Sequence, residues 1–323
     1  MKIFSFDPAD HRDHYAEHGW VHIQGGIDPE FLQALRGFAQ GSLGSHVVEG
    51  RAIAGRKQQA LYEFPDAVDF PGELFDAVAD LCGLHRPTMT LSERHIKAYD
   101  DDAPEEPLPH KDRYASQVSI GLSIEVPDDS RLMLYPDDEV GVNPLNVSAA
   151  YLEGLPPDRR PEVALREIDP VELYDRPGDV MMFAGNAVWH ARRKAANAVN
   201  LYLKLNDFNN DPLGEDPTTE DVRQRTVVAA ADGAIDGKVA ILGRRLDCVS
   251  RRYTRDWSET VQAELWDEPP VSLSEQDVAV LRAVDGRRPA RDVVSAATNG
   301  GSTDSASSSV RYLAERGVLD LLG

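Results

Sequence analysis

Residues 176–190 read Arg-Pro-Gly-Asp-Val-Met-Met-Phe-Ala-Gly-Asn-Ala-Val-Trp-His, and this stretch carries the most specific signal in the sequence. Two turn pairs, Pro177-Gly178 and Gly185-Asn186, bracket a short apolar segment of the length of one β-strand. A second strand is expected to follow the second turn. The pattern therefore places His190 at the start of that next strand.

The segments around this stretch repeat the pattern of short β runs broken by Pro, Gly and Asp. The clearest runs cover residues 94–99, 117–126, 131–135, 179–183 and 199–206. Such runs predict a barrel or sandwich rather than βαβ units. Helices are expected over residues 8–18, from Asp28 onward and over 71–82, with a short strand at 20–23. We therefore expect a mainly β fold with flanking helices, of the α+β class.

A His-x-Asp triplet, His110-Lys111-Asp112, lies upstream. On an extended strand its two outer side chains share a face, which offers two of the three ligands of a 2-His-1-carboxylate Fe(II) site. The triplet alone decides little, because chance supplies about 1.5 His-x-acid triplets in such a chain. The second one, His11-Arg12-Asp13, lies in a polar helical opening and is interpreted as solvated surface. For His190, the alternative is a structural histidine beside a core tryptophan.

The run that follows the triplet strengthens the hypothesis. From residue 117 to 124, polar or small residues alternate with Val118, Ile120, Leu122 and Ile124. This alternation predicts a strand with one packed face and one face turned toward a cavity.

Together these segments resemble the Fe(II)/2-oxoglutarate dioxygenases, and within them the phytanoyl-CoA hydroxylase-like branch. The resemblance covers about residues 10–210 and depends on four segments: residues 15–23, 110–112, 131–136 and 177–190. It implies a double-stranded β-helix (jelly roll, cupin-like) core, with iron held by His110, Asp112 and His190. It also implies hydroxylation of a C–H bond of a small molecule, an amino acid or a specialised metabolite, with O2 consumed and succinate and CO2 as co-products. Members that halogenate lack the carboxylate, so Asp112 favours hydroxylation or another oxidation.

The chain departs from the family where 2-oxoglutarate is held. Members usually bind its distal carboxylate with an Arg on the strand after the last His, since the planar guanidinium matches a carboxylate. Here the polar face of residues 199–206 has no Arg, and Lys204 is the best substitute. Lys97 and Arg192 are further candidates. The alternative for each of these cations is an ordinary surface charge.

Composition and charge exclude several classes of protein. The 323 residues carry a formal net charge of −21, which would repel a phosphate backbone and weighs against nucleic acid as a partner. No apolar run approaches about 18 residues, so no membrane span is expected. The N-terminus lacks an apolar signal core, and two cysteines are too few for a disulfide framework or a Cys-based zinc site. A cytoplasmic location is expected.

The last 55 residues differ from the rest in charge, which suggests a boundary near Pro269-Pro270. We expect a jelly-roll domain over residues 1–212, a connecting α/β segment over 213–268 and a small winged-helix-like module over 269–323. Within the module, helices are expected over 273–284, 290–297 and 310–316, with a flexible Gly/Ser-rich loop over 298–309.

The module leaves the function open to alternatives. It would serve packing or homodimerisation, or recognise a peptide or carrier protein, and its near-neutral charge weighs against DNA. One rival function is therefore a peptide or protein hydroxylase that grips its target with the module. Another is a non-enzymatic jelly-roll binding protein. The substrate itself is expected to be selected by loops such as residues 140–161.

Overall fold

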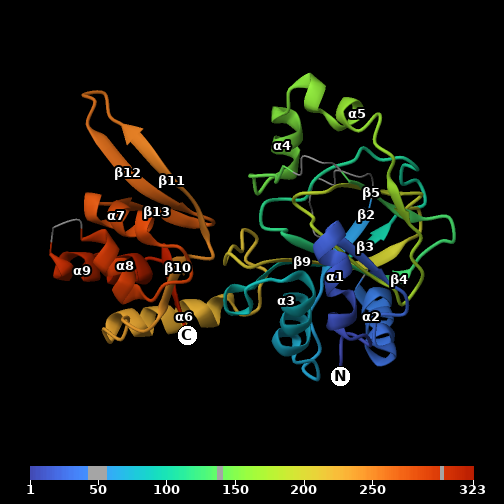
Figure 1. Ribbon diagram of the computed structural model, residues 1–323, viewed down its shortest axis with the longest axis horizontal. Helices are drawn as coiled ribbons and strands as arrows, with labels where there is room; N and C mark the ends of the chain where they lie inside the picture. Colours follow the sequence, from blue (N-terminus) through green and yellow to red (C-terminus); the bar gives the residue numbers. More distant parts are fainter. Residues whose placement is uncertain (43–56, 137–140, 299–301) are drawn as a thin grey trace. The chain divides into compact units, whose positions relative to one another are not determined.

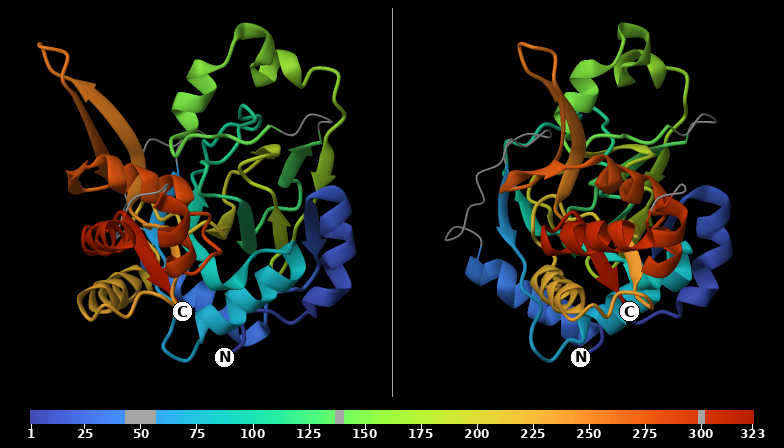
Figure 2. Two further views of the ribbon diagram at one scale, coloured as in Figure 1. Left: turned by 60° about the vertical axis from the view of Figure 1, so that its left-hand side comes forward. Right: turned by 90° about the vertical axis from the view of Figure 1, so that its left-hand side faces the viewer.

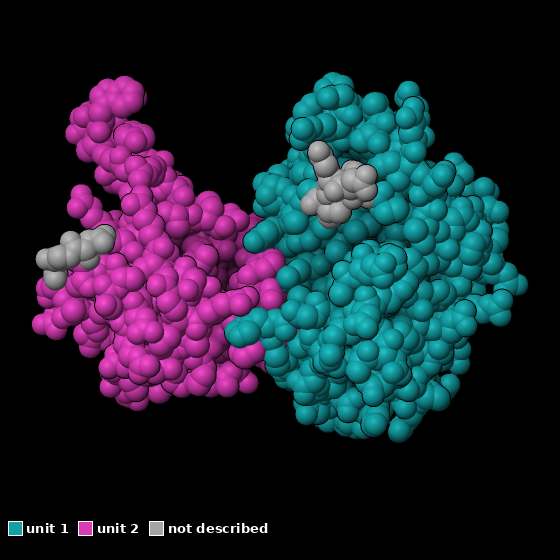
Figure 3. Space-filling view, viewed as in Figure 1, with its two compact units in different colours: residues 1–86, 93–205 teal, residues 87–92, 206–323 magenta. Residues whose placement is uncertain are grey.

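The computed structural model describes residues 1–42, 57–136, 141–298 and 302–323. The chain forms two compact units, coloured separately in Figure 3. Unit 1 comprises residues 1–86 and 93–205, and unit 2 comprises residues 87–92 and 206–323. Each is described by itself.

Unit 1 is built around two β-sheets (Figure 1). The larger has the strand order β1 (Trp20–Ile23), β7 (Val180–Phe183), β4 (Val118–Glu125), β9 (Val199–Asn206), β3 (Thr90–Tyr99) and β2 (Lys57–Leu61). The first three residues of β3 and the last residue of β9 belong to unit 2. The smaller has the order β6 (Val171–Leu173), β5 (Arg131–Tyr135) and β8 (Trp189–Arg193). The pairs β1–β7, β7–β4, β4–β9, β3–β2 and both pairs of the smaller sheet are antiparallel. The unit is thus mixed α/β with antiparallel sheets, as a jelly-roll core requires.

The helices of unit 1 lie before β1, in the connections from β1 to β2 and from β2 to β3, and in the connection from β5 to β6. They are η1 (Pro8–His11), α1 (Arg12–His18), α2 (Pro29–Ser42), η2 (Pro71–Phe75), α3 (Asp76–Cys82), η3 (Arg86–Thr88, whose last two residues belong to unit 2), α4 (Ser148–Gly154), η4 (Pro157–Arg159) and α5 (Pro161–Ala164). Figures 1 and 2 show α2 and α3 on the same side of the strands, with α4 and α5 at the opposite end of the unit. Of the expected substrate-selecting loop 140–161, residue 140 lies outside the described residues and the remainder contains α4 and η4.

Local sequence signals account for most of these boundaries. Asp28 was expected to cap a helix, and its Oδ1 accepts from the N–H groups of Glu30 and Phe31 at the start of α2. Gly19 ends α1 in the left-handed conformation, with φ of 72°, and so turns the chain into β1. The predicted strand at 20–23 and the five predicted β runs are confirmed within a few residues.

The alternation predicted in β4 is also confirmed. Val118, Ile120, Leu122 and Ile124 are almost completely buried in the hydrophobic core. On the other face, Ser119 reaches the polar interior of the unit, where its Oγ donates to Asp112 Oδ2 at 2.6 Å. One strand therefore supplies both the packing of the core and a wall of the polar interior.

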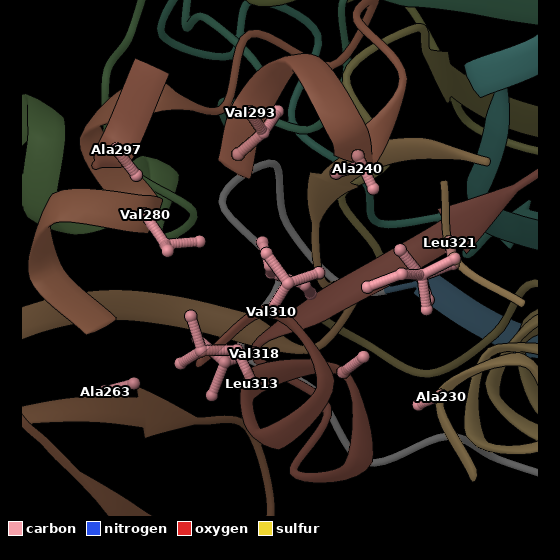
Figure 4. Packing of buried hydrophobic residues seen from close by; sticks show 14 of the residues in the cluster. Ala230, Ala240, Ala263, Val280, Val293, Ala297, Val310, Leu313, Val318 and Leu321 are labelled. Atoms are coloured by element: carbon pink, nitrogen blue, oxygen red, sulfur yellow. The ribbon is translucent and has the colours of Figure 1, made fainter. Parts of the chain in front are cut away.

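Unit 2 packs a helical group and two small sheets on one hydrophobic core (Figure 4). Its elements are α6 (Thr219–Ala231), β10 (Val239–Leu242), β11 (Leu246–Tyr253), β12 (Glu259–Leu265), β13 (Glu268–Leu273), α7 (Glu275–Ala283), α8 (Ala290–Ala297), α9 (Thr303–Glu315) and β14 (Leu319–Leu322). β10 pairs with β14, and β11, β12 and β13 form a three-stranded antiparallel sheet. The core extends from Ala229 to Leu321, so it draws on both sides of Pro269-Pro270, which lie inside β13. The three-part division of the sequence stays a prediction, and the structure itself has two units.

The predicted loop over residues 298–309 is wrong from residue 303 onward, because α9 begins at Thr303. Ser302 caps the helix by accepting from the N–H of Asp304 at 3.2 Å. Ala306, Val310 and Leu313 follow at helical spacing and are completely buried, so packing outweighs the loop-like Gly/Ser composition. Residues 299–301 lie outside the described residues. In the described part of the chain, no helix is both long and apolar enough to span a membrane.

Candidate metal centre

Backbone hydrogen bonds bring the His110–Asp112 segment against the start of β8. His110 and His190 form an isolated antiparallel bridge, in which each N–H donates to the carbonyl oxygen of the other at 2.9 Å. Two residues further on, the N–H of Asp112 donates to the carbonyl of Gly185 at 2.9 Å. These bonds join two segments that are about 80 residues apart in the sequence. Two of the bonds lie between the histidines, and the third lies at Asp112.

The three predicted ligands come together at this junction. One ligand atom from each of His110, Asp112 and His190 lies within 4.8 Å of the others, a group able to hold a metal ion. His190 Nε2 lies 3.6 Å from Asp112 Oδ2, and His110 Nε2 lies 3.9 Å from Asp112 Oδ1. Two imidazole nitrogens and one carboxylate form the donor set of the facial triad. The residues therefore fit a divalent transition metal with coordination positions left for other ligands.

His190 is held in the form that a metal requires. The carbonyl oxygen of Val188 lies 3.0 Å from Nδ1 of His190, so Nδ1 carries the proton and the lone pair of Nε2 faces Asp112. Burial lowers the pKa of His190, and the nearby Asp112 carboxylate only partly opposes this. The ring is therefore neutral at neutral pH, as a metal ligand must be.

Asp112 is oriented by a set of short contacts. Ser119 Oγ donates to Oδ2 at 2.6 Å, and the Lys204 ammonium contacts the same carboxylate oxygen and lies 3.0 Å from Ser119 Oγ. Burial alone would raise the pKa of Asp112, but the charge and the hydrogen bond of the Lys204 ammonium hold it well below its ordinary value. The Asp112 carboxylate is therefore ionised throughout the physiological pH range, as a metal ligand would have to be.

Two asparagines brace the backbone around Asp112. Asn143 Nδ2 donates to the Asp112 carbonyl at 2.8 Å, and the N–H of Asn143 donates to the Asn186 carbonyl at 2.8 Å. Asn186 Nδ2 in turn donates to the carbonyl of Tyr114 at 2.8 Å. The sequence reasoning missed Asn143, and it noted Asn186 only as part of a turn pair.

Gly185 is required for close approach. A Cβ at this position would lie 1.9 Å from Ser119 Oγ and 2.8 Å from Asp112 Oδ2. Any side chain would therefore displace the serine and the carboxylate that it orients. The Gly-Asn turn signal located this glycine, but the reason for it lies in the tertiary packing.

The three cations proposed for 2-oxoglutarate occupy different surroundings. Lys204 lies at the triad, on the face of β9 that the alternation of residues 199–206 predicted. Lys97 Nζ donates to Glu93 Oε1 at 2.7 Å. Arg192 is buried and uses both terminal nitrogens in a bidentate pair with Asp175, at 2.9 Å each. Of the three, Lys204 contacts the triad directly.

Comparisons with known proteins give no family assignment. No protein-family model matches the chain, and no curated protein matches it. Among solved structures, the non-heme alpha ketoglutarate dependent epimerase SnoN from nogalamycin biosynthesis is similar at 15% identity, with a TM-score of 0.45, over 62% of this chain and 83% of that chain. A Pseudomonas putida prolyl-4-hydroxylase is similar at 15% identity and a TM-score of 0.41, over 61% of this chain and 96% of that chain.

HygX from Streptomyces hygroscopicus, solved with nickel and 2-oxoglutarate bound, is similar at 13% identity and a TM-score of 0.39, over 62% of this chain and 88% of that chain. All three likenesses are too distant to assign a function. The functional assignment therefore depends on the geometry of the site itself.

Proposed function

We propose that the chain is a non-haem Fe(II)/2-oxoglutarate-dependent oxygenase that acts on a small molecule. The observation that carries the proposal is the group of His110, Asp112 and His190, whose ligand atoms lie within 4.8 Å of one another. An Fe(II) ion there, with 2-oxoglutarate and O2, supplies the oxidation of a substrate C–H bond, with succinate and CO2 as co-products.

The protein contributes ligand orientation. The Val188 carbonyl sets the tautomer of His190, and Ser119 sets the rotation of the Asp112 carboxylate. The backbone bridge between residues 110 and 190 holds the two imidazoles at a ring-centroid distance of 4.5 Å. The Phe183 ring lies 4.7 Å from the His190 ring, centroid to centroid, in an edge-on arrangement, and so adds an apolar contact to this imidazole.

Lys204 is proposed to bind the far carboxylate of 2-oxoglutarate. Its ammonium lies beside the triad and pairs with Asp112. A divalent cation bound to Asp112 would compete with Lys204 for the carboxylate oxygens. The Lys204 ammonium would then pair with a second anion, the far carboxylate of 2-oxoglutarate. Lys97 remains a further candidate for this role, whereas the bidentate pairing of Arg192 with Asp175 makes Arg192 a weaker one.

Several finer assignments belong to the same proposal. They are membership of the phytanoyl-CoA hydroxylase-like branch, hydroxylation as the reaction, a cytoplasmic location and a winged-helix-like role for residues 269–323 in peptide or carrier-protein recognition or in homodimerisation. The retained carboxylate of Asp112 favours hydroxylation over halogenation. The other assignments are supported by the sequence patterns of residues 10–210 and 269–323.

The test is anaerobic titration of the Fe(II)-loaded protein with 2-oxoglutarate, followed through the weak visible charge-transfer band of the bidentate keto-acid complex. We expect the band in the wild type and its loss in Asp112→Ala. Asp13→Ala is the matched control, because Asp13 belongs to the other His-x-Asp triplet and lies on the exposed surface of α1.

Each alternative outcome has a definite meaning. Iron binding without the band would point to an oxygenase that does not use 2-oxoglutarate. No iron binding would overturn the proposal and favour a non-enzymatic binding protein. If Asp13→Ala and Asp112→Ala reduce the charge-transfer band equally, residues 110–112 do not hold the metal more specifically than residues 11–13 do.

A further inference from the structure

A second cluster of charged side chains lies on the inner face of β3. Glu93 is almost completely buried, and it accepts from Lys97 Nζ at 2.7 Å and from Arg113 Nη2 at 2.9 Å. His95 Nδ1 lies 3.4 Å from the same carboxylate. Glu93, His95 and Lys97 share a face because the side chains of a strand alternate with a period of two. Arg113 directly follows the metal-ligand candidate Asp112.

The cluster carries a surplus positive charge. Lys97 and Arg113 are two cations around the single carboxylate of Glu93, and they hold the pKa of Glu93 well below its ordinary value against the effect of burial. Two further cations of this interior, Lys204 and Arg192, are each matched by an aspartate of their own. Among the described residues that these interactions join, one positive charge therefore remains without a carboxylate, and an anionic ligand would compensate it.

Arg113 is the member best placed to meet a ligand. Its side chain is 23% exposed, whereas that of Glu93 is 4% exposed. In the described part of the chain, only its Nη2 has a hydrogen-bond acceptor, so the other donors of the planar guanidinium remain for a ligand. A guanidinium presented in this way matches a carboxylate bidentately.

The cluster adjoins the metal centre. Lys97 Nζ lies 5.2 Å from the ring centroid of Tyr202, and Lys204 Nζ lies 5.6 Å from the same centroid. Tyr202 is thus a common wall of the Glu93 cluster and of the triad.

We infer that Arg113, held by Glu93 and supported by Lys97, binds a carboxylate of the substrate, so that the substrate class is a singly charged carboxylic acid. This inference rests on the proposed function. The two negative charges of 2-oxoglutarate match the two positive charges of Fe(II), which leaves the surplus charge of the cluster for the substrate. Arg113 is thus a specificity-determining residue.

The test uses propanoate as the probe and propanamide as its neutral counterpart of equal shape. The full chain is loaded with Mn(II) and saturating 2-oxoglutarate, and paramagnetic relaxation of the probe's methyl protons reports binding close to the metal without any turnover. We expect faster relaxation of propanoate than of propanamide. Arg113→Gln should weaken propanoate binding by roughly tenfold, the effect of one charged hydrogen bond.

Two further variants complete the design. Arg166→Gln removes an exposed guanidinium from the same unit and should leave propanoate binding unchanged. Arg113→Lys keeps the charge and should retain more binding than Arg113→Gln, which guards against a variant that merely misfolds. Equal relaxation of propanoate and propanamide, or equal effects of the Gln variants at residues 113 and 166, would overturn the inference. If the Fe(II)–2-oxoglutarate band forms while propanoate shows no preference, only this inference fails. If the band does not form, the proposed function fails first.

Discussion

Replacing Gly185 by Ala should disrupt the candidate metal centre without removing any ligand. The added Cβ would lie 1.9 Å from Ser119 Oγ, about 1.5 Å short of an ordinary van der Waals contact. The serine hydroxyl must therefore leave its position. Its 2.6 Å hydrogen bond to Asp112 Oδ2 is lost as it moves.

The magnitude follows from these two effects. Overpacking of a closely packed site costs about 1–3 kcal/mol of folding free energy. Loss of a hydrogen bond to a metal-ligating carboxylate weakens metal affinity by about 10–100-fold. We therefore expect Gly185→Ala to lower the melting temperature by several degrees and to weaken Fe(II) or Mn(II) binding within that range.

The assay pairs thermal unfolding of the metal-free protein with a metal titration by calorimetry. Gly37→Ala is the matched control, because Gly37 lies inside α2 and a Cβ there would meet nothing within 4 Å. The same substitution should stabilise that helix by about 0.5–1 kcal/mol and leave metal binding unchanged.

A double variant isolates the cause. In a Ser119→Gly background the hydroxyl that the new methyl group meets is absent, so Gly185→Ala should cost less there than in the wild type. Wild-type metal affinity in Gly185→Ala would refute the steric argument. If the free-energy costs of the two substitutions are additive in the double variant, the clash with the Ser119 hydroxyl is not the reason that glycine is needed at residue 185.

Three further predictions concern the charged groups. Lys204→Met should weaken 2-oxoglutarate binding by about 10–100-fold in a titration of the visible band, while metal affinity is retained. Asp175→Asn should destabilise the protein by about 3–5 kcal/mol in denaturant unfolding, because it leaves the buried Arg192 without its counter-ion; an effect below about 1 kcal/mol would contradict a buried pair. The folded-state pKa of His190 is lowered, so the unfolded chain binds its proton more readily; stability should decline as the pH falls below about 6.5, and His190→Gln should reduce that decline in pH-dependent melting curves.

Local patterns in the sequence were sufficient for the strands that carry the site. The period-two alternation of residues 117–124 and of 199–206 depends only on neighbouring residues. The isoleucine and leucine residues of both strands are buried, and Ser119 and Lys204 meet on the predicted polar face. The turn pairs around residues 180–183 likewise delimit β7 and lead into β8, where His190 is the second residue. These signals are local because strand geometry and turn geometry are local.

Amino-acid composition did not predict the helix that begins at Thr303, because tertiary packing stabilises it. The Gly/Ser-rich character of residues 298–309 predicted a loop, yet α9 begins at Thr303. Serine has only a modest helix propensity, and the buried face of Ala306, Val310 and Leu313 supplies the stabilisation that propensity lacks. That face is recognisable only when the rest of the unit 2 core is present.

Local patterns in the sequence predicted the three candidate ligands and the polar face of the strand that bears Lys204. Which cation reaches the three residues depends on the tertiary structure. Lys204 contacts the triad because the register between β9 and β4 places Lys204 opposite Ser119. Arg192 pairs instead with Asp175, 17 residues earlier in the chain. Glu93 and Arg113, 20 residues apart, became a charged cluster only through folding. The interaction between two charged side chains depends on the distance between them in the folded chain. The pairing of strands sets that distance, and no local sequence pattern specifies the pairing.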